Sequence, residues 1–168
     1  LARVGGAFLW ALMASGAAAD ETHGPVVVEL FTSQGCAACP PADALLGELA
    51  MREDVIALAL HVDYWDYIGW KDEFADPRNA KRQRGYARTA GRRSVYTPEM
   101  IVNGTSDIVG SKPMELAMAI EEHKAGDKWV AVRLEVQGDG RLKVLAEALR
   151  DGLGPMDIVM LRYHPARV

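Results

Sequence analysis

The sequence predicts an α/β domain, in which helices flank a central sheet, followed by a small antiparallel β unit. Short β-branched and apolar runs at residues 25–32 and 55–62 are typical of buried strands. Between them, residues 41–52 carry leucines at the spacing of an amphipathic helix. From residue 129 onward the apolar residues recur at every second position, which indicates antiparallel strands. The strand–helix–strand order and this change of period define the fold class.

The middle of the chain is expected to hold a hairpin between two further helices. Asn103-Gly104 is the strongest two-residue signal for a hairpin turn, and apolar runs at 100–102 and 108–109 flank it. Residues 63–95 form a helical insertion that begins with an aromatic-rich loop. The two helices are expected at residues 77–89 and 113–124.

The C-terminal unit is expected to be a three-stranded antiparallel meander within residues 128–168. Valine and leucine alternate with alanine and charged residues over 130–136, and Gly138-Asp139-Gly140 supplies a turn. Two more β-rich runs follow, separated by a loop of glycine and proline. The three strands are expected at residues 130–136, 142–149 and 157–163.

Composition and charge exclude several classes of protein. The chain has 168 residues, of which 49% are apolar and 25% charged, the balance of a globular protein rather than a disordered one. The formal net charge of −4 argues against nucleic-acid binding through bulk charge. Two cysteines are too few for a disulfide scaffold or a four-thiolate zinc site, and the four histidines form no metal-ligand cluster in sequence. The chemistry of the domain therefore depends on one pair of thiols.

Residues 1–19 have the pattern of a secretory signal peptide. Arg3 precedes an apolar run at 4–14, and an Ala-x-Ala sequence ends the segment. The run is shorter than the roughly 20 apolar residues that a membrane-spanning helix needs. We therefore expect cleavage after Ala19 and a periplasmic or secreted mature protein without an integral membrane segment. In that compartment a cysteine pair can exist as a disulfide.

The motif that carries chemistry is Cys36-Ala37-Ala38-Cys39. It lies between a predicted buried strand and a predicted helix, where a βα turn exposes side chains at one end of the sheet. The double proline that follows is expected in the first turn of the helix. A CxxC pair also serves as half of a zinc site, but the chain has no second pair. A purely structural disulfide would close too short a loop to remove much entropy from the unfolded chain, so the motif favours redox chemistry.

Thr97-Pro98 immediately precedes the first strand of the predicted hairpin. The order of strand, CxxC, helix and strand, followed by Thr-Pro, a hairpin and a helix, resembles the thioredoxin superfamily over residues 25–125. The resemblance implies a cis peptide bond before Pro98, an isomer that is readily populated only before proline. It also implies that the Thr97-Pro98 backbone binds an extended substrate beside the disulfide. We expect Tyr96 and Trp65 to take part in the same substrate site.

Three longer stretches are similar to the secreted bacterial proteins grouped as domain of unknown function 1223. That family has a thioredoxin-like core followed by a β-rich region, and it has no assigned substrate. The resemblance implies a thioredoxin-like domain at residues 20–127. Because the family continues beyond a segment like residues 156–168, we also expect the C-terminal unit to be truncated. The stretches are VELFTSQGCAACPP at 28–41, HVDYWDYIGW at 61–70 and VYTPEMIVNG at 95–104.

Glu29 is the candidate proton acceptor for the thiols. The thioredoxin resemblance implies a buried acid six residues before the first cysteine, but that position is Leu30 here, and Glu29 lies seven residues before Cys36. A one-residue bulge in the strand would aim Glu29 at the thiols. The alternatives are an outward orientation or a pair with a basic side chain.

Three other groups of residues are weaker candidates. A group of His61, Asp63 and Asp66 together with the two cysteines would suit copper or zinc. Strand alternation nevertheless favours a structural pair between His61 and Asp63. The aromatic residues between 64 and 74 are expected to form a small core, with one or two lining a substrate groove. Seven basic residues between Arg78 and Arg93, with no acid among them, are expected to form a solvated helix face or a surface for an anionic partner.

The sequence therefore predicts an exported thiol–disulfide oxidoreductase without a metal or an organic cofactor. Cys36 is expected to attack as the thiolate and Cys39 to resolve the mixed disulfide, with Glu29 moving the proton. The expected partners are thiol or disulfide substrates, including proteins, and not nucleic acids. Two other hypotheses remain: a copper carrier that uses the thiols and His61, and a binding module in which the CxxC pair is not catalytic.

Overall fold

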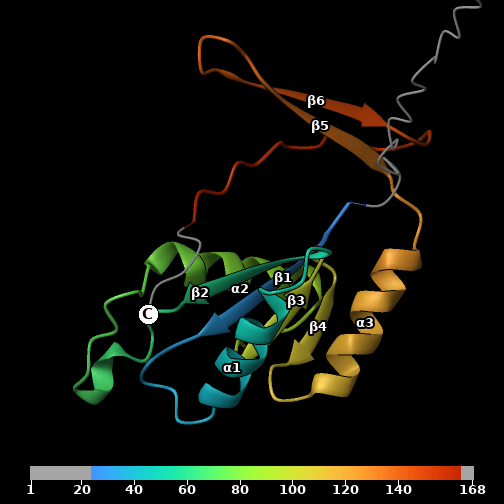
Figure 1. Cartoon of the computed structure of the whole chain (residues 1–168). Helices are drawn as coiled ribbons and strands as arrows, with labels where there is room; N and C mark the ends of the chain where they lie inside the picture. The colour runs from blue at the N-terminus through green and yellow to red at the C-terminus, as the bar shows by residue number, and fades with distance from the viewer. Residues whose placement is uncertain (1–23, 164–168) are drawn as a thin grey trace, which may run out of the picture.

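The structure, a computed structural model, describes residues 24–163 and is built around a four-stranded sheet (Figure 1). Its strands are β1 (Val26–Thr32), β2 (Val55–His61), β3 (Glu99–Val102) and β4 (Ser106–Val109). β1 runs parallel to β2 and antiparallel to β3, and β3 forms a hairpin with β4, which gives the order β2-β1-β3-β4. This mixed sheet with flanking helices confirms the predicted α/β fold. The predicted signal peptide lies outside the described residues.

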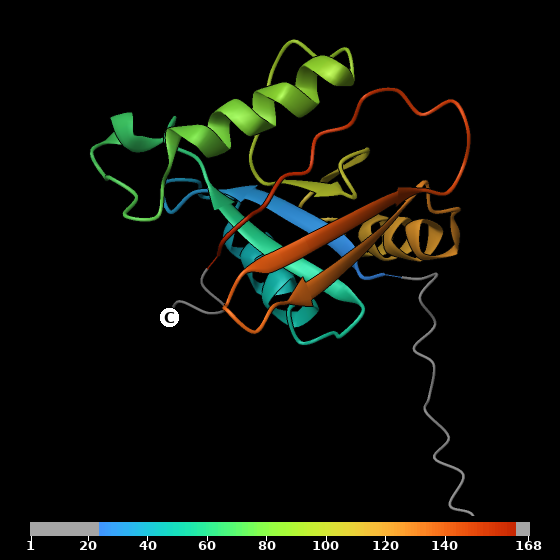
Figure 2. The same ribbon diagram turned by 90° about the horizontal axis from the view of Figure 1, so that it is seen from above.

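Three helices cover the two faces of the sheet: α1 (Pro40–Leu49), α2 (Pro77–Thr89) and α3 (Pro113–Ala125). Each begins with a proline. Proline lacks a backbone N–H, but an N–H in the first turn of a helix has no partner within the helix, and the fixed φ of proline suits the helical conformation. α1 and α3 pack on one face, over a core that includes Leu30, Leu46 and Ile120. α2 packs on the other face, where Phe31 and Ala80 meet (Figure 2). Over residues 24–163, no helix combines the length and the apolar character that crossing a bilayer requires.

β1 is covered on both faces, and its alternation decides which helix each side chain meets. Val26, Val28 and Leu30 face α1 and α3, whereas Glu29 and Phe31 face α2. β1 pairs with β2 residue for residue along its whole length. The bulge that would aim Glu29 at the cysteines is therefore absent from β1, because a bulge sets two residues of one strand against one residue of the other.

The connection between β2 and α2 contains the aromatic insertion loop, which includes a short 3-10 helix (Asp66–Ile68). It projects beyond the end of the sheet at which β1 and β2 finish (Figure 1). Tyr64 and Trp65 pack against the core on the α2 side, as expected for a small aromatic core. Tyr67 and Trp70 instead expose 81% and 60% of their surface. The insertion loop is therefore partly core and partly an exposed aromatic surface.

The C-terminal strands β5 (Val130–Val136) and β6 (Leu142–Ala148) form a separate two-stranded antiparallel sheet (Figures 1 and 2). The predicted third strand at 157–163 is wrong, because residues 153–163 form no strand. A strand takes a defined register when one of its faces is buried, and this hairpin covers no apolar face. The apolar run within 157–163 therefore has no buried surface to align it.

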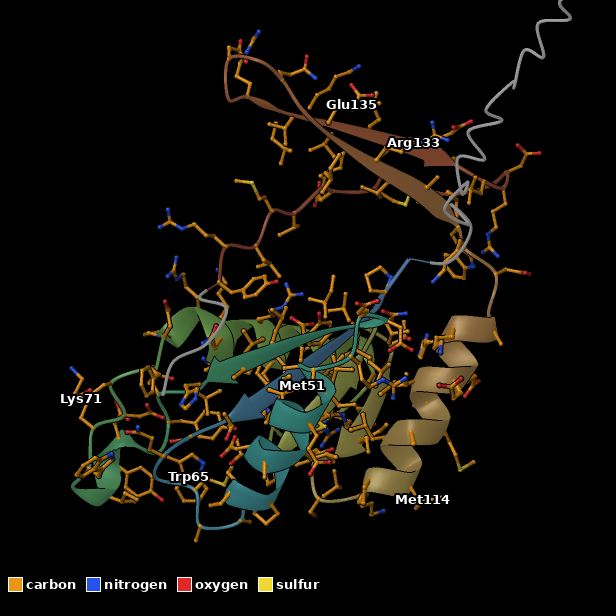
Figure 3. All side chains as sticks on the ribbon, viewed as in Figure 1. Met51, Trp65, Lys71, Met114, Arg133 and Glu135 are labelled. Carbon is orange, nitrogen blue, oxygen red and sulfur yellow. A yellow bond between two sulfur atoms is a disulfide. The ribbon has the colours of Figure 1, made fainter. Side chains whose placement is uncertain are left out.

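One face of the β5–β6 hairpin is apolar and exposed. Leu134 lies opposite Val144, and every second residue along both strands falls on the same side. Leu134 exposes 64% of its surface. The charged residues gather on the opposite side, where Lys143 pairs with Glu135, and Figure 3 labels Arg133 and Glu135 there. The hairpin is amphipathic, although its apolar side is not packed in a core.

Candidate active site

Cys36 and Cys39 form a disulfide in the turn between β1 and α1. The N–H of Cys36 donates to the Ser33 carbonyl, and the N–H of Cys39 donates to the Cys36 carbonyl, each at 3.1 Å. Cys39 caps α1, because its carbonyl accepts the N–H groups of Ala42 at 2.9 Å and Asp43 at 3.0 Å. Cys36 exposes 3% of its surface and Cys39 none. Cys36 is therefore the more accessible member of a nearly buried pair.

The peptide bond between Thr97 and Pro98 is cis, as the resemblance implied. Pro98 is buried against the first turn of α1: a Cβ on Gly110 would lie 2.8 Å from Pro98 Cβ and 2.9 Å from Ala42 Cβ. A side chain at position 110 would force the Pro98 loop and the helix apart. The Pro98 carbonyl also accepts the N–H of Gly110 at 3.0 Å. The cis-proline loop thus packs against the helix that Cys39 caps.

Trp65 joins the aromatic insertion loop to both of these segments. Its Nε1–H donates to Thr97 Oγ1 at 2.8 Å. A Cβ on Gly35 would lie 3.1 Å from Trp65 Cβ and 3.1 Å from Ile68 Cδ1, so the insertion loop rests on the residue before Cys36. In Figure 3, Trp65 lies between the green insertion loop and the blue loop that carries the cysteines. The structure therefore brings Trp65, the cis-proline loop and the disulfide turn together.

Tyr96 precedes this group, but its contacts point elsewhere. Its carbonyl accepts a hydrogen bond from Gln83 Nε2 at 2.7 Å. Its ring centroid lies 5.5 Å from the guanidinium carbon of Arg92. Burial raises the pKa of Tyr96 to about 12, and the negative charges of Glu99 and Asp107 contribute to the shift. A role for Tyr96 in substrate binding stays a prediction.

Glu29 is 1% exposed and is held by two side chains of α2. Arg82 donates from Nε to Oε1 at 2.6 Å and from Nη2 to Oε2 at 3.2 Å, and the Tyr86 hydroxyl donates to Oε2. These contacts lie on the α2 face of the sheet, whereas the helix that follows Cys39 packs on the opposite face. The structure matches the alternative in which Glu29 pairs with a basic side chain, and it does not bring Glu29 to the cysteines.

A second buried acid, Glu99, is neutralised in the same way. Gln83 donates from Nε2 at 2.5 Å, and Arg92 donates from Nη2. Arg92 also pairs with Asp107 at 3.0 Å. The basic stretch that includes α2 is therefore only partly a solvated face. Sequence reasoning allowed a basic partner for Glu29 without identifying Arg82, and it missed the pair of Glu99 with Arg92. The available signal was that buried strands carry acids while the basic stretch carries none.

Four polar side chains meet where β1 and β2 end, and we call Thr32, Asp43, His61 and Asp72 the strand-end cluster. Thr32 lies opposite His61 in the strand register. The Thr32 hydroxyl donates to Asp43 Oδ1 at 2.7 Å, and His61 Nδ1 lies 2.7 Å from Asp72 Oδ2. The partner of His61 is therefore Asp72, whereas strand alternation favoured Asp63. Sequence reasoning did not assemble this cluster, although it identified His61.

Burial and hydrogen bonds set the charges of the strand-end cluster. Burial raises the pKa of Asp43, and the hydrogen bond from Thr32 and the charge of His61 offset only part of this effect. Burial also opposes the ionisation of Asp72, but hydrogen bonds from the backbone of Gln34 and from His61 outweigh it, so that the pKa of Asp72 is lowered. The cluster thus combines a carboxylate that ionises readily with one that holds its proton more tightly.

Across residues 24–163, no three His, Cys, Asp or Glu side chains are grouped so that they could hold a metal ion. The two sulfurs are joined to each other, and His61 Nδ1 is engaged by Asp72. A copper site formed by the thiols and His61 would therefore require reduction of the disulfide and ligation through the other ring nitrogen.

The chain is similar to several known proteins. The model of a family described as protein of unknown function (DUF1223) matches residues 27–168. A protein from Agrobacterium tumefaciens with an X-ray crystal structure is 42% identical in sequence to this chain, and the two structures match with a TM-score of 0.63. The match covers 70% of this chain and 54% of the Agrobacterium protein. HBP35 of Porphyromonas gingivalis is 18% identical in sequence, with a TM-score of 0.43, and the match covers 68% of this chain and 37% of HBP35. No curated protein matches. The chain spans about half the length of the Agrobacterium protein.

Proposed function

Because this chain belongs to the family of proteins of unknown function DUF1223, whose description assigns no reaction, we propose its function from the site: an exported, thioredoxin-like thiol–disulfide oxidoreductase. One observation carries the proposal. The Cys36–Cys39 disulfide follows an interior strand, and the loop with the cis Thr97–Pro98 bond lies close to the first turn of the helix that Cys39 caps. The proposed reaction uses no organic cofactor, since the two sulfurs themselves carry the electrons.

The proposed reaction exchanges one disulfide for another. In the reduced protein, the Cys36 thiolate attacks one sulfur of a substrate disulfide and releases the other as a thiolate. Cys39 then loses its proton and attacks Cys36 Sγ, which forms the Cys36–Cys39 disulfide and releases the second substrate thiolate. The substrate gains two electrons and the protein loses two. Run in reverse, the oxidised protein forms a disulfide in a dithiol substrate.

The burial of the two cysteines supports these roles. Cys36 retains some exposed surface and Cys39 has none. Ala37 and Ala38, which separate them, are exposed. A substrate sulfur that approaches across this small-residue turn meets Cys36 first, and Cys39 is sheltered for the resolving step.

We place the substrate backbone along Thr97, with Trp65 as one wall of the site. Trp65 contacts the Thr97 hydroxyl and packs against Gly35, so it borders the cysteine turn and the cis-proline loop. The exposed Tyr67 and Trp70 extend an aromatic surface from this wall. Such a surface favours peptide substrates with apolar or aromatic side chains near the reacting sulfur.

Export is part of the proposal and is supported by the signal-peptide pattern of residues 1–19. Protein purified from the periplasm or the medium is expected to begin at Asp20. A mature protein that retains Leu1 would contradict export by cleavage of this segment.

The experiment that tests the exchange reaction compares three proteins. Reduction of insulin by dithiothreitol, and exchange with oxidised glutathione, are measured for the unmodified chain, Cys36→Ser and Cys39→Ser. We expect the unmodified chain to accelerate both reactions at least tenfold over Cys36→Ser. Cys39→Ser should accumulate a covalent adduct of one substrate molecule, because the resolving thiol is absent. An unmodified chain no faster than Cys36→Ser would refute the proposed function.

A further inference from the structure

The strand-end cluster of Thr32, Asp43, His61 and Asp72 has no role in the proposed exchange chemistry, yet hydrogen bonds tie it to both ends of the disulfide turn. On the helix side, the N–H of Asp43 donates to the Cys39 carbonyl at 3.0 Å. On the strand side, Asp72 Oδ2 accepts the N–H of Gln34 at 2.8 Å, two residues before Cys36.

The resolving step needs a group that takes up a proton. Cys39 is fully buried, and burial in an apolar environment disfavours a thiolate. Only the thiolate attacks, so the Cys39 proton must leave before the sulfur reaches Cys36 Sγ. Glu29 faces the opposite side of the sheet and is held by Arg82. A side-chain acceptor is therefore expected on the α1 side of the sheet, where the helix that Cys39 caps is packed.

Asp43 has the position that this role requires. It follows by four residues the cap residue Cys39, whose backbone is already helical with φ of −79° and ψ of −34°. Side chains four apart in a helix lie on the same face, about 5–6 Å apart at Cβ. Helical side chains also lean toward the N-terminus, which directs the Asp43 carboxylate toward the turn that contains Cys39. Asp43 lies at the surface of α1, but its carboxylate reaches the buried hydroxyl of Thr32. It can therefore receive a proton inside and release it to water.

We infer that Asp43 accepts the proton of the Cys39 thiol in the resolving step, and that the His61–Asp72 pair is a positioning group that sets the electrostatic field at Asp43. The inference rests on the proposed thiol–disulfide exchange. In the step, the S–H bond of Cys39 breaks and its proton passes to the Asp43 carboxylate. The Cys39 thiolate forms a bond to Cys36 Sγ, and the substrate leaves as a thiolate.

The electrostatics of the cluster suit this role. Burial raises the pKa of Asp43, which makes its carboxylate a better base toward a thiol. The titratable groups that face it are His61 from β2, whose charge acts against the shift, and Asp72 from the insertion loop, whose charge adds to it. The Thr32 hydroxyl fixes one carboxylate oxygen.

The test separates the two thiol steps with one reagent. Reduced protein is mixed with 5,5′-dithiobis(2-nitrobenzoate), and two equivalents of thionitrobenzoate are followed by absorbance. The first is released when Cys36 attacks the reagent, and the second when Cys39 resolves the adduct. In Asp43→Asn at pH 7 we expect the second phase to slow at least tenfold while the first phase is unchanged. Asp43→Glu should recover most of the second-phase rate, because it restores a carboxylate.

Matched variants separate proton transfer from structure. Glu48→Gln removes an exposed acid from the same helix and should leave both phases unchanged. In the unmodified chain the second-phase rate should rise with pH as Asp43 ionises, and this limb should be absent in Asp43→Asn. His61→Gln should move the limb to higher pH, because a neighbour whose charge lowers the pKa of Asp43 is lost.

Several results would overturn the inference. It fails if Asp43→Asn leaves the second phase unchanged, or slows both phases equally, or if Asp43→Glu gives no recovery. Thr32→Val, which removes only the hydroxyl donor, provides an independent check and should alter the second phase alone. Failure of the proposed function is distinct, because it appears as an unmodified chain no faster than Cys36→Ser on oxidised glutathione. The two phases with the aromatic disulfide can still be measured in that case.

Discussion

Replacing Arg82 with methionine is predicted to destabilise the protein, because it leaves the Glu29 charge uncompensated inside the fold. The Glu29 side chain is 2% exposed, whereas that of Arg82 is 35% exposed. Arg82 and Tyr86 donate to the Glu29 carboxylate in the structure, and in the variant the Tyr86 hydroxyl remains. Methionine keeps an unbranched apolar stem in the space of the arginine stem, so the loss is mainly electrostatic.

The size of the effect follows from the asymmetry of this pair. Removing one partner of a buried ion pair costs about 3–5 kcal/mol. Because Arg82 is one third exposed and Tyr86 remains, we expect the lower end, about 3 kcal/mol. With a urea slope of about 2 kcal/mol per molar, the unfolding midpoint should fall by about 1.5 M. Glu29→Gln should cost less, about 1–2 kcal/mol, because the freed guanidinium can reach water.

The assay is urea unfolding of the oxidised protein at pH 7, followed by circular dichroism. Arg84→Met, at an exposed position of the same helix, is the matched control and should stay within about 0.5 kcal/mol of the unmodified protein. The double variant Glu29→Met with Arg82→Met should recover most of the loss, since an apolar pair often replaces a buried ion pair without cost. If Arg82→Met shifts the midpoint no more than Arg84→Met, the buried pair does not stabilise the fold.

Three further predictions test other parts of the structure. The pKa of Asp72 is lowered in the folded protein, so its ionisation stabilises the fold above its ordinary value of 3.8, and this contribution is lost as the pH falls through that range. Asp72→Asn should therefore lower stability at pH 7 and make the melting temperature fall less steeply as the pH is lowered. An unchanged fall in acid would contradict the stabilising role of ionised Asp72. Trp65→Phe removes the N–H donor to Thr97 and should cost about 0.5–1.5 kcal/mol. Faster amide exchange over residues 65–70 should accompany it, and unaltered exchange would count against the contact. Leu134→Glu should change the unfolding free energy by less than about 0.5 kcal/mol and reduce binding of an apolar dye, whereas a large loss would show that this hairpin face is covered.

Features governed by neighbouring residues could be predicted from the sequence. The Asn103-Gly104 turn has φ values of 45° and 74° at its two central positions, the left-handed conformation that this pair favours. Asn103 also accepts the N–H of Val27 at 2.8 Å and so ties the turn to β1. The cysteine pair and the cis bond before Pro98 belong to the same class, because a short motif specifies each of them.

Contacts between distant residues could not be predicted in the same way. Hydrophobic periodicity shows that β1 is buried, but it does not show which helix covers which face. The partners Glu29 and Arg82 are 53 positions apart, and their pairing depends on α2 crossing the face opposite α1. His61 was identified, but its partner Asp72 lies at the far side of an irregular loop. The path of such a loop is not encoded in any repeating pattern.

The third C-terminal strand shows the limit of pattern alone. Residues 157–163 have the composition of a strand, as do β5 and β6. A strand also needs a partner with free backbone groups and a buried face that fixes its register. Tertiary context therefore decides between strand and extended coil where the local sequence permits both.

The central claim is that the Cys36–Cys39 disulfide is a redox centre rather than a structural bridge. The most direct measurement equilibrates the purified protein with thiol–disulfide buffers of known potential, followed by thiol alkylation and mass determination. We predict a reversible two-electron transition between about −270 and −120 mV, the range of thiol–disulfide oxidoreductases. A pair that stays oxidised below about −300 mV, as structural disulfides do, would contradict it.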